Sequence, residues 1–453
     1  VAEQALSPQQ AQAIGESMMV EIRRDISFVD DVELEQYLQT LGQRLAAASP
    51  DNRQPFHFFV LEDPSVNAFA LPAGFIGVHT GLLTAARSES ELAAVLAHEI
   101  AHVTQHHLAR IIAQQERNSL ATLGAIALGI LAARSNPDVA NAAIASAQAG
   151  MAQKQLDYTR EHEHEADRVG LSILAQAGFD PRAMSDFFGQ LQRATRLYDD
   201  GTVPAYLRTH PLTTERIADV ENRAAQYPYR QTPDSLEFQL LRARLKTQQQ
   251  TARDSIAYWQ TLLREQRYSQ EATPRYGLVQ AYLRANQPIL AQQEMQRLAS
   301  LKLANPLLTR LQWQVWQANG QSALIRKNCS HALSQWPTAA ALRYDCARVE
   351  LQANQARTAL TLLNNGGDFV AQDWRSEALR AEAFTRLGQR SASHAAQAES
   401  YIRQGKLEAA IDQLERAQNS NDGDFYTLSR VDARLRELKQ RRELAKQKTA
   451  NKR

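Results

Sequence analysis

Two histidines four residues apart, His98 and His102, constrain this chain more than any other feature. The segment from Ser88 to Val103 contains no Gly or Pro, and its apolar residues recur at helical spacing. On one helix the two imidazoles share a face and can bind one metal ion, and Glu99 can reach a water on that ion, as in zinc metallopeptidases. An exposed histidine pair is the alternative. Small and apolar neighbours predict a buried helix instead, and buried ionisable groups need partners.

A protein-bound zinc ion needs a third ligand, and a later charged segment offers candidates. Glu163 and Asp167 lie four residues apart and therefore share one face of a second predicted helix. We interpret Glu163 as a candidate third ligand, and Asp167 as a group that hydrogen-bonds the far nitrogen of a ligand histidine. His162 and His164 are alternative ligands, which we rank below Glu163. Glu161 and Glu165 lie on other faces of the helix, and we expect both to be solvated.

The chain resembles the HtpX-like and CAAX-prenyl-protease-like gluzincin family in four elements. They are the H-E-x-x-H helix, the E-x-x-x-D helix about sixty residues later, and the segments 67–83 and 209–217 that flank them, in the family's order. This resemblance implies that Glu163 is the third ligand of one Zn²⁺ per chain, in a metalloendopeptidase. Members with a TPR-like second half are most similar. They imply a periplasmic quality-control protease for unfolded or misassembled outer-membrane β-barrel proteins and their assembly machinery.

The segment 209–217 adds two candidate site residues, because the resemblance places it beside the cleft. His210 could be a fourth zinc ligand that displaces water and keeps the enzyme latent, or a surface histidine. Arg216 could stabilise an oxyanion, or form a structural ion pair. Because the residue before a proline is disfavoured in a helix, we expect a loop over residues 206–211.

A length of 453 residues predicts two or three domains. We expect a predominantly helical α+β fold: a gluzincin-type metallopeptidase domain with a small β-sheet over residues 1–225, a linker over 226–240, and an α-solenoid over 241–453. Residues 56–61 predict a strand, and residues 66–79 predict a hairpin. The strand nearest the zinc-binding helix could bind an extended substrate through its main chain.

Turns that recur about every 34 residues beyond the linker predict TPR-like helix pairs. Such stacks form surfaces that bind protein segments, here clients and, by resemblance, the β-barrel assembly machinery. Cys329 and Cys346 flank the turn at Pro337, so antiparallel helices would bring them level. A disulfide there would contribute roughly 3 kcal/mol, and two buried thiols are the alternative.

Net charge and hydropathy bear on whether the chain binds nucleic acid or crosses a membrane. A net charge of +2 gives no reason to expect nucleic acid, and no run of eighteen apolar residues indicates a transmembrane helix. The apolar segment 120–133 is too short to span a membrane, so it predicts a core helix or an interfacial segment. Together with the Ala-rich residues up to Lys154, we interpret it as a helical flap near the cleft, with a buried helical hairpin or a peripheral membrane contact as alternatives. A first residue other than Met fits a removed signal peptide or an artificial boundary.

Two other functions are alternatives to a periplasmic peptidase. A TPR scaffold or chaperone could carry a latent or structural zinc site. An intramembrane prenyl-type protease is weakened by the missing transmembrane spans.

Overall fold

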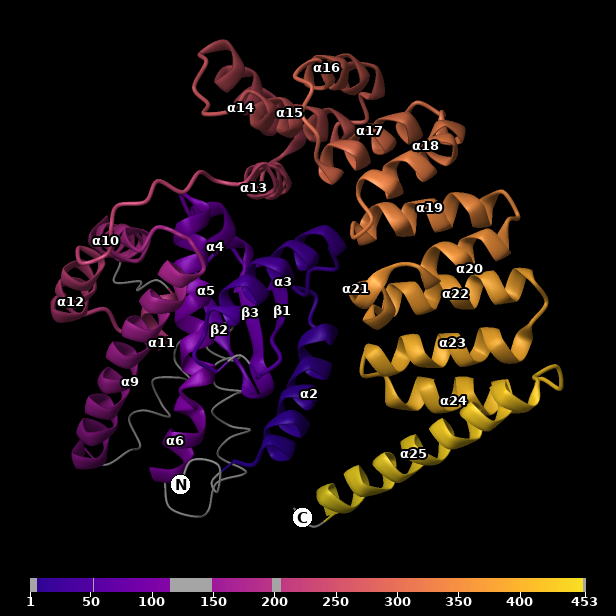
Figure 1. Cartoon of the computed structure of the whole chain (residues 1–453), viewed down its shortest axis with the longest axis horizontal. Coiled ribbons are helices and arrows are strands. Elements are labelled where there is room, and N and C mark those ends of the chain that lie inside the picture. The colour runs from indigo at the N-terminus through magenta and orange to yellow at the C-terminus, as the bar shows by residue number, and fades with distance from the viewer. Residues whose placement is uncertain (1–5, 52, 115–148, 198–204, 451–453) are drawn as a thin grey trace. The chain divides into compact units, whose positions relative to one another are not determined.

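The computed structural model describes residues 6–51, 53–114, 149–197 and 205–450, and the chain divides into two compact units, residues 1–245 and 246–453 (Figure 1). The apolar segment 120–133 and most of the predicted flap lie outside the described residues. Within the described ranges, no helix combines the length and the apolar character needed to cross a membrane.

Helices of the first unit begin where side chains can cap them. Ser7, Asp31, Ser88 and Thr213 each accept a hydrogen bond from a first-turn N–H, which satisfies donors that a helix leaves unpaired. The helices are α2 (Pro8–Arg24), α3 (Val32–Ala47), α4 (Thr80–Ala85), α5 (Glu89–Thr104), α6 (His107–Gln114), α9 (Ala149–Gln176), α10 (Arg182–Leu197), α11 (Ala205–Thr209), α12 (Thr214–Ala224) and α13 (Leu236–Gln248).

A three-stranded sheet in the order β1-β3-β2 lies among these helices. Strand β3 (Phe75–His79) runs parallel to β1 (His57–Leu61) and antiparallel to β2 (Ala68–Ala70). The pair β2–β3 is the predicted hairpin, and β2 is an edge strand of the described sheet. His57 lies in β1 and His79 in β3, and neither belongs to the group of metal-binding candidates among the described residues.

Helix α5 forms the centre of the first unit. It packs against β2, α3, α9 and α10, and the view in Figure 1 shows α9 beside it. Leu92, Leu96 and Ile100 have no exposed surface. Burial on several sides explains why this helix is nearly all apolar apart from its site residues.

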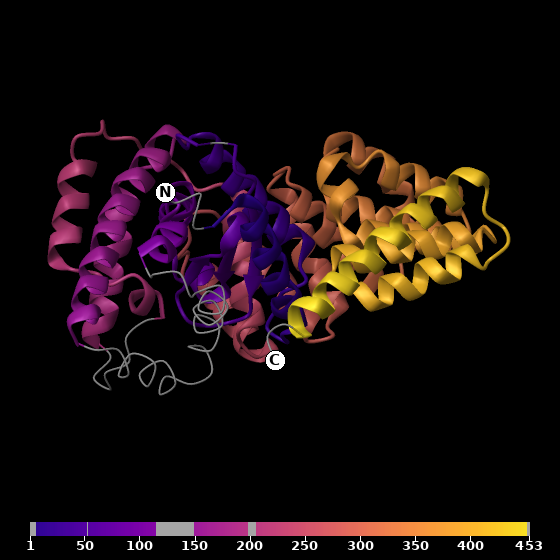
Figure 2. The same ribbon diagram turned by 90° about the horizontal axis from the view of Figure 1, so that it is seen from below.

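The second unit consists of successive helices that lie side by side in both views (Figures 1 and 2). Its predicted turns contain residues with left-handed backbone, with φ between 54° and 73° at Asn286, Gly320, Asn354, Gly388 and Gly405. The helices are α14 (Ala252–Arg264), α15 (Ala272–Arg284), α16 (Pro288–Ser300), α17 (Pro306–Ala318), α18 (Ser322–Gln335), α19 (Ala340–Gln352), α20 (Ala356–Asn364), α21 (Gly367–Gln372), α22 (Trp374–Arg386), α23 (Arg390–Arg403), α24 (Leu407–Gln418) and α25 (Phe425–Ala450).

The predicted disulfide is confirmed. Cys329 of α18 and Cys346 of α19 are bonded, with their Cα atoms 5.8 Å apart. The predominantly helical α+β class is also confirmed, whereas the predicted loop over 206–211 is wrong. Residues Ala205–Thr209 form α11, because Pro211 restricts only the residue directly before it, and His210 N–H still donates to the Tyr206 carbonyl at 2.9 Å.

Candidate metal centre

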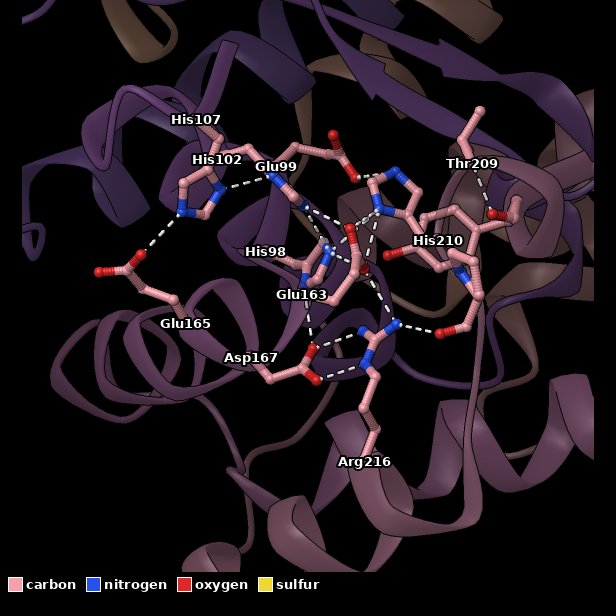
Figure 3. A network of polar contacts seen from close by, with 12 residues as sticks. His98, Glu99, His102, His107, Glu163, Glu165, Asp167, Thr209, His210 and Arg216 are labelled. Atoms are coloured by element: carbon pink, nitrogen blue, oxygen red, sulfur yellow. Dashed lines mark hydrogen bonds and ion pairs between the residues drawn. The ribbon is translucent and has the colours of Figure 1, made fainter. Parts of the chain in front are cut away.

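The site depends on a close crossing of α5 and α9. Gly170 of α9 lies against the zinc-motif helix: a Cβ at this position would be 3.1 Å from both the Cα and the N of His98. Only a residue without a side chain allows this distance without a shift of one helix. The crossing brings Glu163, two turns earlier on α9, beside the histidine pair of α5 (Figure 3).

Four predicted site residues converge on one point. One donor atom each from His98, His102, Glu163 and His210 lies within 4.8 Å of the others. The Nε2 atoms of His98 and His102 are 3.0 Å apart, and the Glu163 carboxylate lies 3.4 Å from the first and 3.3 Å from the second. His210 Nδ1 lies 3.1 Å from Glu163 Oε1 and 3.3 Å from His98 Nε2.

This donor set fits zinc. Zn²⁺ prefers imidazole nitrogen, thiolate sulfur and carboxylate oxygen in a tetrahedral arrangement, and the cluster supplies three imidazoles and a carboxylate. His98, Glu163 and His210 are buried, so a cation would balance a carboxylate that is removed from water. Glu99 points toward the same cluster, and both of its carboxylate oxygens are buried.

Asp167 occupies the position expected for it behind His98. Its carboxylate lies 3.0 Å from His98 Nδ1, so the Nε2 atom of the same ring faces the cluster. Arg216 Nε and Nη2 donate to the two Asp167 oxygens, each at 2.7 Å. Arg216 Nη1 also donates to the Pro211 carbonyl and lies 2.9 Å from Glu163. Arg216 thus has the geometry of the ion-pair alternative and not of a free oxyanion donor.

His210 reaches the cluster from α11 and the turn after it. Its ring stacks on the Tyr206 ring, with centroids 4.6 Å apart, and its Nε2 lies 3.4 Å from Glu99. The surface-histidine alternative is therefore wrong, since only 7% of His210 is exposed. With His210 included, the cluster offers four protein donors, which is the number found in closed zinc sites.

Burial and mutual contacts shift the pKa values of these groups. Burial raises the pKa of Glu99. Burial would also raise that of Glu163, but His210 and His102 outweigh it and hold the Glu163 pKa well below its usual value. Burial opposes the charged form of His98, yet its contacts with Asp167 and Glu163 raise the pKa to about 10. The carboxylates of Asp167 and Glu163 therefore favour the protonated form of His98, whereas burial lowers the pKa of His102 to about 4.

His107 and Glu165 lie on the side of His102 away from the cluster, and neither was predicted to belong to the site. His107, the first residue of α6, contacts His102 Nδ1, and Glu165 contacts His107. Glu165 was predicted to be solvated, which is wrong: it also accepts a hydrogen bond from Arg110 Nη1 at 2.5 Å. Their spacing from the zinc motif matches no known ligand pattern, so no local signal pointed to them.

An apolar cavity of about 450 Å³ opens beside the cluster. Glu99, His102 and Glu163 line its polar end, together with His210. The edge strand β2 contributes to its wall, and the apolar part includes Ile14, Phe69, Leu71, Val103, Leu108 and Ile111.

Comparisons with known proteins agree with this geometry. Residues 33–224 match peptidase family M48. The chain is 32% identical over 447 residues to the beta-barrel assembly-enhancing protease of Escherichia coli K12, covering 97% of this chain and 90% of that protein. It is 44% identical over 249 residues to a Vibrio cholerae relative, of which the alignment spans 50%. The mitochondrial metalloendopeptidase OMA1 of Schizosaccharomyces pombe is 32% identical over 185 residues, 41% of this chain and 51% of OMA1.

The match to the E. coli protein covers both units, whereas the family match falls within the first unit. The first unit therefore contains the peptidase, and the helical second unit is shared with the full-length relative. From the His/Glu cluster, the family match and the full-length relative together, the chain belongs to peptidase family M48 and is a gluzincin-type, zinc-dependent metalloendopeptidase.

Proposed function

We propose that this chain is a periplasmic endopeptidase that cleaves unfolded or misassembled outer-membrane β-barrel proteins. The observation that carries the proposal is the convergence of His98, His102 and Glu163 beside the buried carboxylate of Glu99. The names of the full-length relatives support a role in β-barrel assembly. The disulfide Cys329–Cys346 supports an oxidising compartment such as the periplasm.

In this proposal His98, His102 and Glu163 hold the zinc ion. When bound, zinc polarises a scissile carbonyl and acidifies a water. The Glu99 carboxylate accepts a proton from the attacking water and returns it to the leaving amine, which is general acid–base catalysis by one group. The Asp167 carboxylate lies 3.0 Å from His98 Nδ1, and this contact keeps the His98 Nε2 lone pair directed at the metal position.

The edge strand β2 and the cavity suggest how an extended substrate binds. A peptide that pairs with β2, the edge strand of the described sheet, gains main-chain hydrogen bonds without a sequence requirement. Side chains alternate along such a peptide, so one can enter the apolar cavity while its neighbours point away. Strands of outer-membrane barrels alternate apolar and polar residues, which fits this arrangement. We assign the helical second unit the role of a TPR-type surface that binds clients and the β-barrel assembly machinery.

The decisive experiment uses Glu99→Gln. We expect zinc content near one ion per chain, as in the wild type, and loss of cleavage of an unfolded β-barrel protein. Glu161→Gln, an exposed position on α9, is the matched control and should keep both properties. Wild-type zinc content with undiminished cleavage in the Glu99→Gln protein would show that another group is the base. A wild type without zinc would remove the whole site.

A second candidate function, a chaperone or scaffold with a latent zinc site, is favoured by the position of His210. If zinc is bound, His210 as a fourth protein donor would take the place that water has in catalytic zinc sites. His210→Ala should raise proteolysis if the residue is a latch. If His210 is a structural ligand, the same change should lower zinc content and leave proteolysis low. Peripheral membrane contact by residues 120–133 stays a prediction.

A further inference from the structure

The two zinc-motif histidines are supported from behind by different residues. His98 Nδ1 faces the carboxylate of Asp167, the usual partner of a ligand histidine. His102 Nδ1 instead lies 2.8 Å from Nδ1 of another histidine, His107. The Nε2 atom of His107 is 3.1 Å from Glu165 Oε2 (Figure 3), and Arg110 Nη1 contacts the same oxygen.

A break in the helix makes this contact possible. On a continuous helix, a residue five positions after His102 would lie about 140° away around the axis and could not face it. Helix α5 ends at Thr104, and His106 adopts a left-handed backbone with φ 53° before α6 begins. The helix is therefore interrupted between the two residues, and His107 is buried against His102, with only 2% of its surface exposed. Left-handed backbone is uncommon at residues other than Gly, so the turn is held by its surroundings.

The positions of the hydrogens follow from the chain of contacts. His102 presents Nε2 to the metal position, so this nitrogen must carry the lone pair and Nδ1 must carry the hydrogen. That hydrogen is donated to His107 Nδ1, which accepts only when it is unprotonated. The remaining hydrogen of a neutral His107 is then on Nε2, and Nε2 donates to the Glu165 carboxylate. Each donor therefore faces an acceptor.

We infer that His107 is a positioning residue which, held by Glu165, fixes the tautomer and ring orientation of His102 for zinc binding. The inference rests on the proposed role of His102 as a ligand. Both supports end in a carboxylate held by an arginine, Asp167 by Arg216 and Glu165 by Arg110, but only Glu165 acts through a second imidazole. Groups behind metal ligands of this kind change metal affinity by about 10–100-fold when they are removed.

The test measures zinc affinity of the full chain by competition with a chelator. His107→Leu removes the acceptor, and we expect zinc affinity to fall by about 10–100-fold. In His107→Asn the amide oxygen can take the place of Nδ1, so affinity should return to within a few-fold of wild type. A Co²⁺-substituted sample provides a second readout, because the visible absorption bands of His107→Leu should shift while those of His107→Asn should not.

Glu165→Gln with Glu161→Gln as its matched control keeps the inference testable if His107→Leu does not fold. Both glutamates are on α9, but only Glu165 contacts His107. We expect a loss of about tenfold in zinc affinity for Glu165→Gln and none for the control. Equal zinc affinity in the folded His107→Leu or Glu165→Gln variant and in wild type would overturn the inference. A wild type that binds no zinc would instead overturn the proposed function.

Discussion

Removal of Asp167 should separate the stability of the apo protein from its metal affinity. Asp167 accepts two hydrogen bonds from Arg216, and the side chains of both residues are only 1% exposed. Breaking a buried ion pair from one side costs about 3–5 kcal/mol. Arg216 keeps its contacts with Glu163 and the Pro211 carbonyl, so we expect the lower end for Asp167→Leu, about 3 kcal/mol.

The double variant Asp167→Leu/Arg216→Met isolates the second role of Asp167. Replacing both buried partners with apolar residues of similar size is often nearly neutral, so apo stability should recover in part. It should stay below wild type, because Glu163 and the Pro211 carbonyl then lack the Arg216 guanidinium. Zinc affinity should remain reduced by about 10–100-fold, because His98 Nδ1 still has no carboxylate acceptor.

Urea unfolding in the presence of a chelator measures apo stability. All five tryptophans lie beyond residue 245, so their fluorescence reports the second unit, and the transition seen only by circular dichroism belongs to the first. Chelator competition measures zinc affinity in the same samples. Recovery of zinc affinity in the double variant would refute the reasoning, because it would show that His98 needs no acceptor.

Three further predictions concern positions away from direct metal contact. Cys329→Ser leaves Cys346 unpaired and opens a loop of 17 residues, so the tryptophan-detected transition should lose about 3 kcal/mol. Burial and the nearby Glu89 raise the pKa of Glu237 to about 7, above its unfolded value of 4.5. The folded state then binds the proton more tightly, so stability falls as the pH rises from 4.5 through 7, and Glu237→Gln should remove up to about 3 kcal/mol of that loss in unfolding measured at each pH. Gly170→Ala should push α9 away from α5 and lower zinc affinity, whereas Gly189→Ala, which would meet only a side chain, should not.

Local patterns in the sequence were sufficient for much of the site. The spacing of His98 and His102 places both on one helix face at any position in a fold, and the same holds for Glu163 and Asp167. Turn residues at regular intervals similarly predicted the helix pairs of the second unit. The turn between Cys329 and Cys346 predicted that the two cysteines lie close together on neighbouring helices. Only the resemblance to a family predicted that Glu163 lies beside His98 and His102, because spacing within one helix does not indicate which other helix it packs against.

The remaining features depend on contacts between segments far apart in the sequence. The surface alternative for His210 was excluded only when α11 and its turn were found against Tyr206 and Glu99. His107 and Glu165 carried no local signal, because the position of His107 depends on where α5 ends and on the left-handed backbone at His106.

The amino-acid order thus determined which side chains could share a metal ion, since helix geometry is local and repeats every few residues. Which groups stand behind those side chains, and whether the Arg216 guanidinium is occupied, depended on how α5, α6, α9 and α12 pack. Packing is decided by burial and shape over the whole unit, and a single segment does not contain that information.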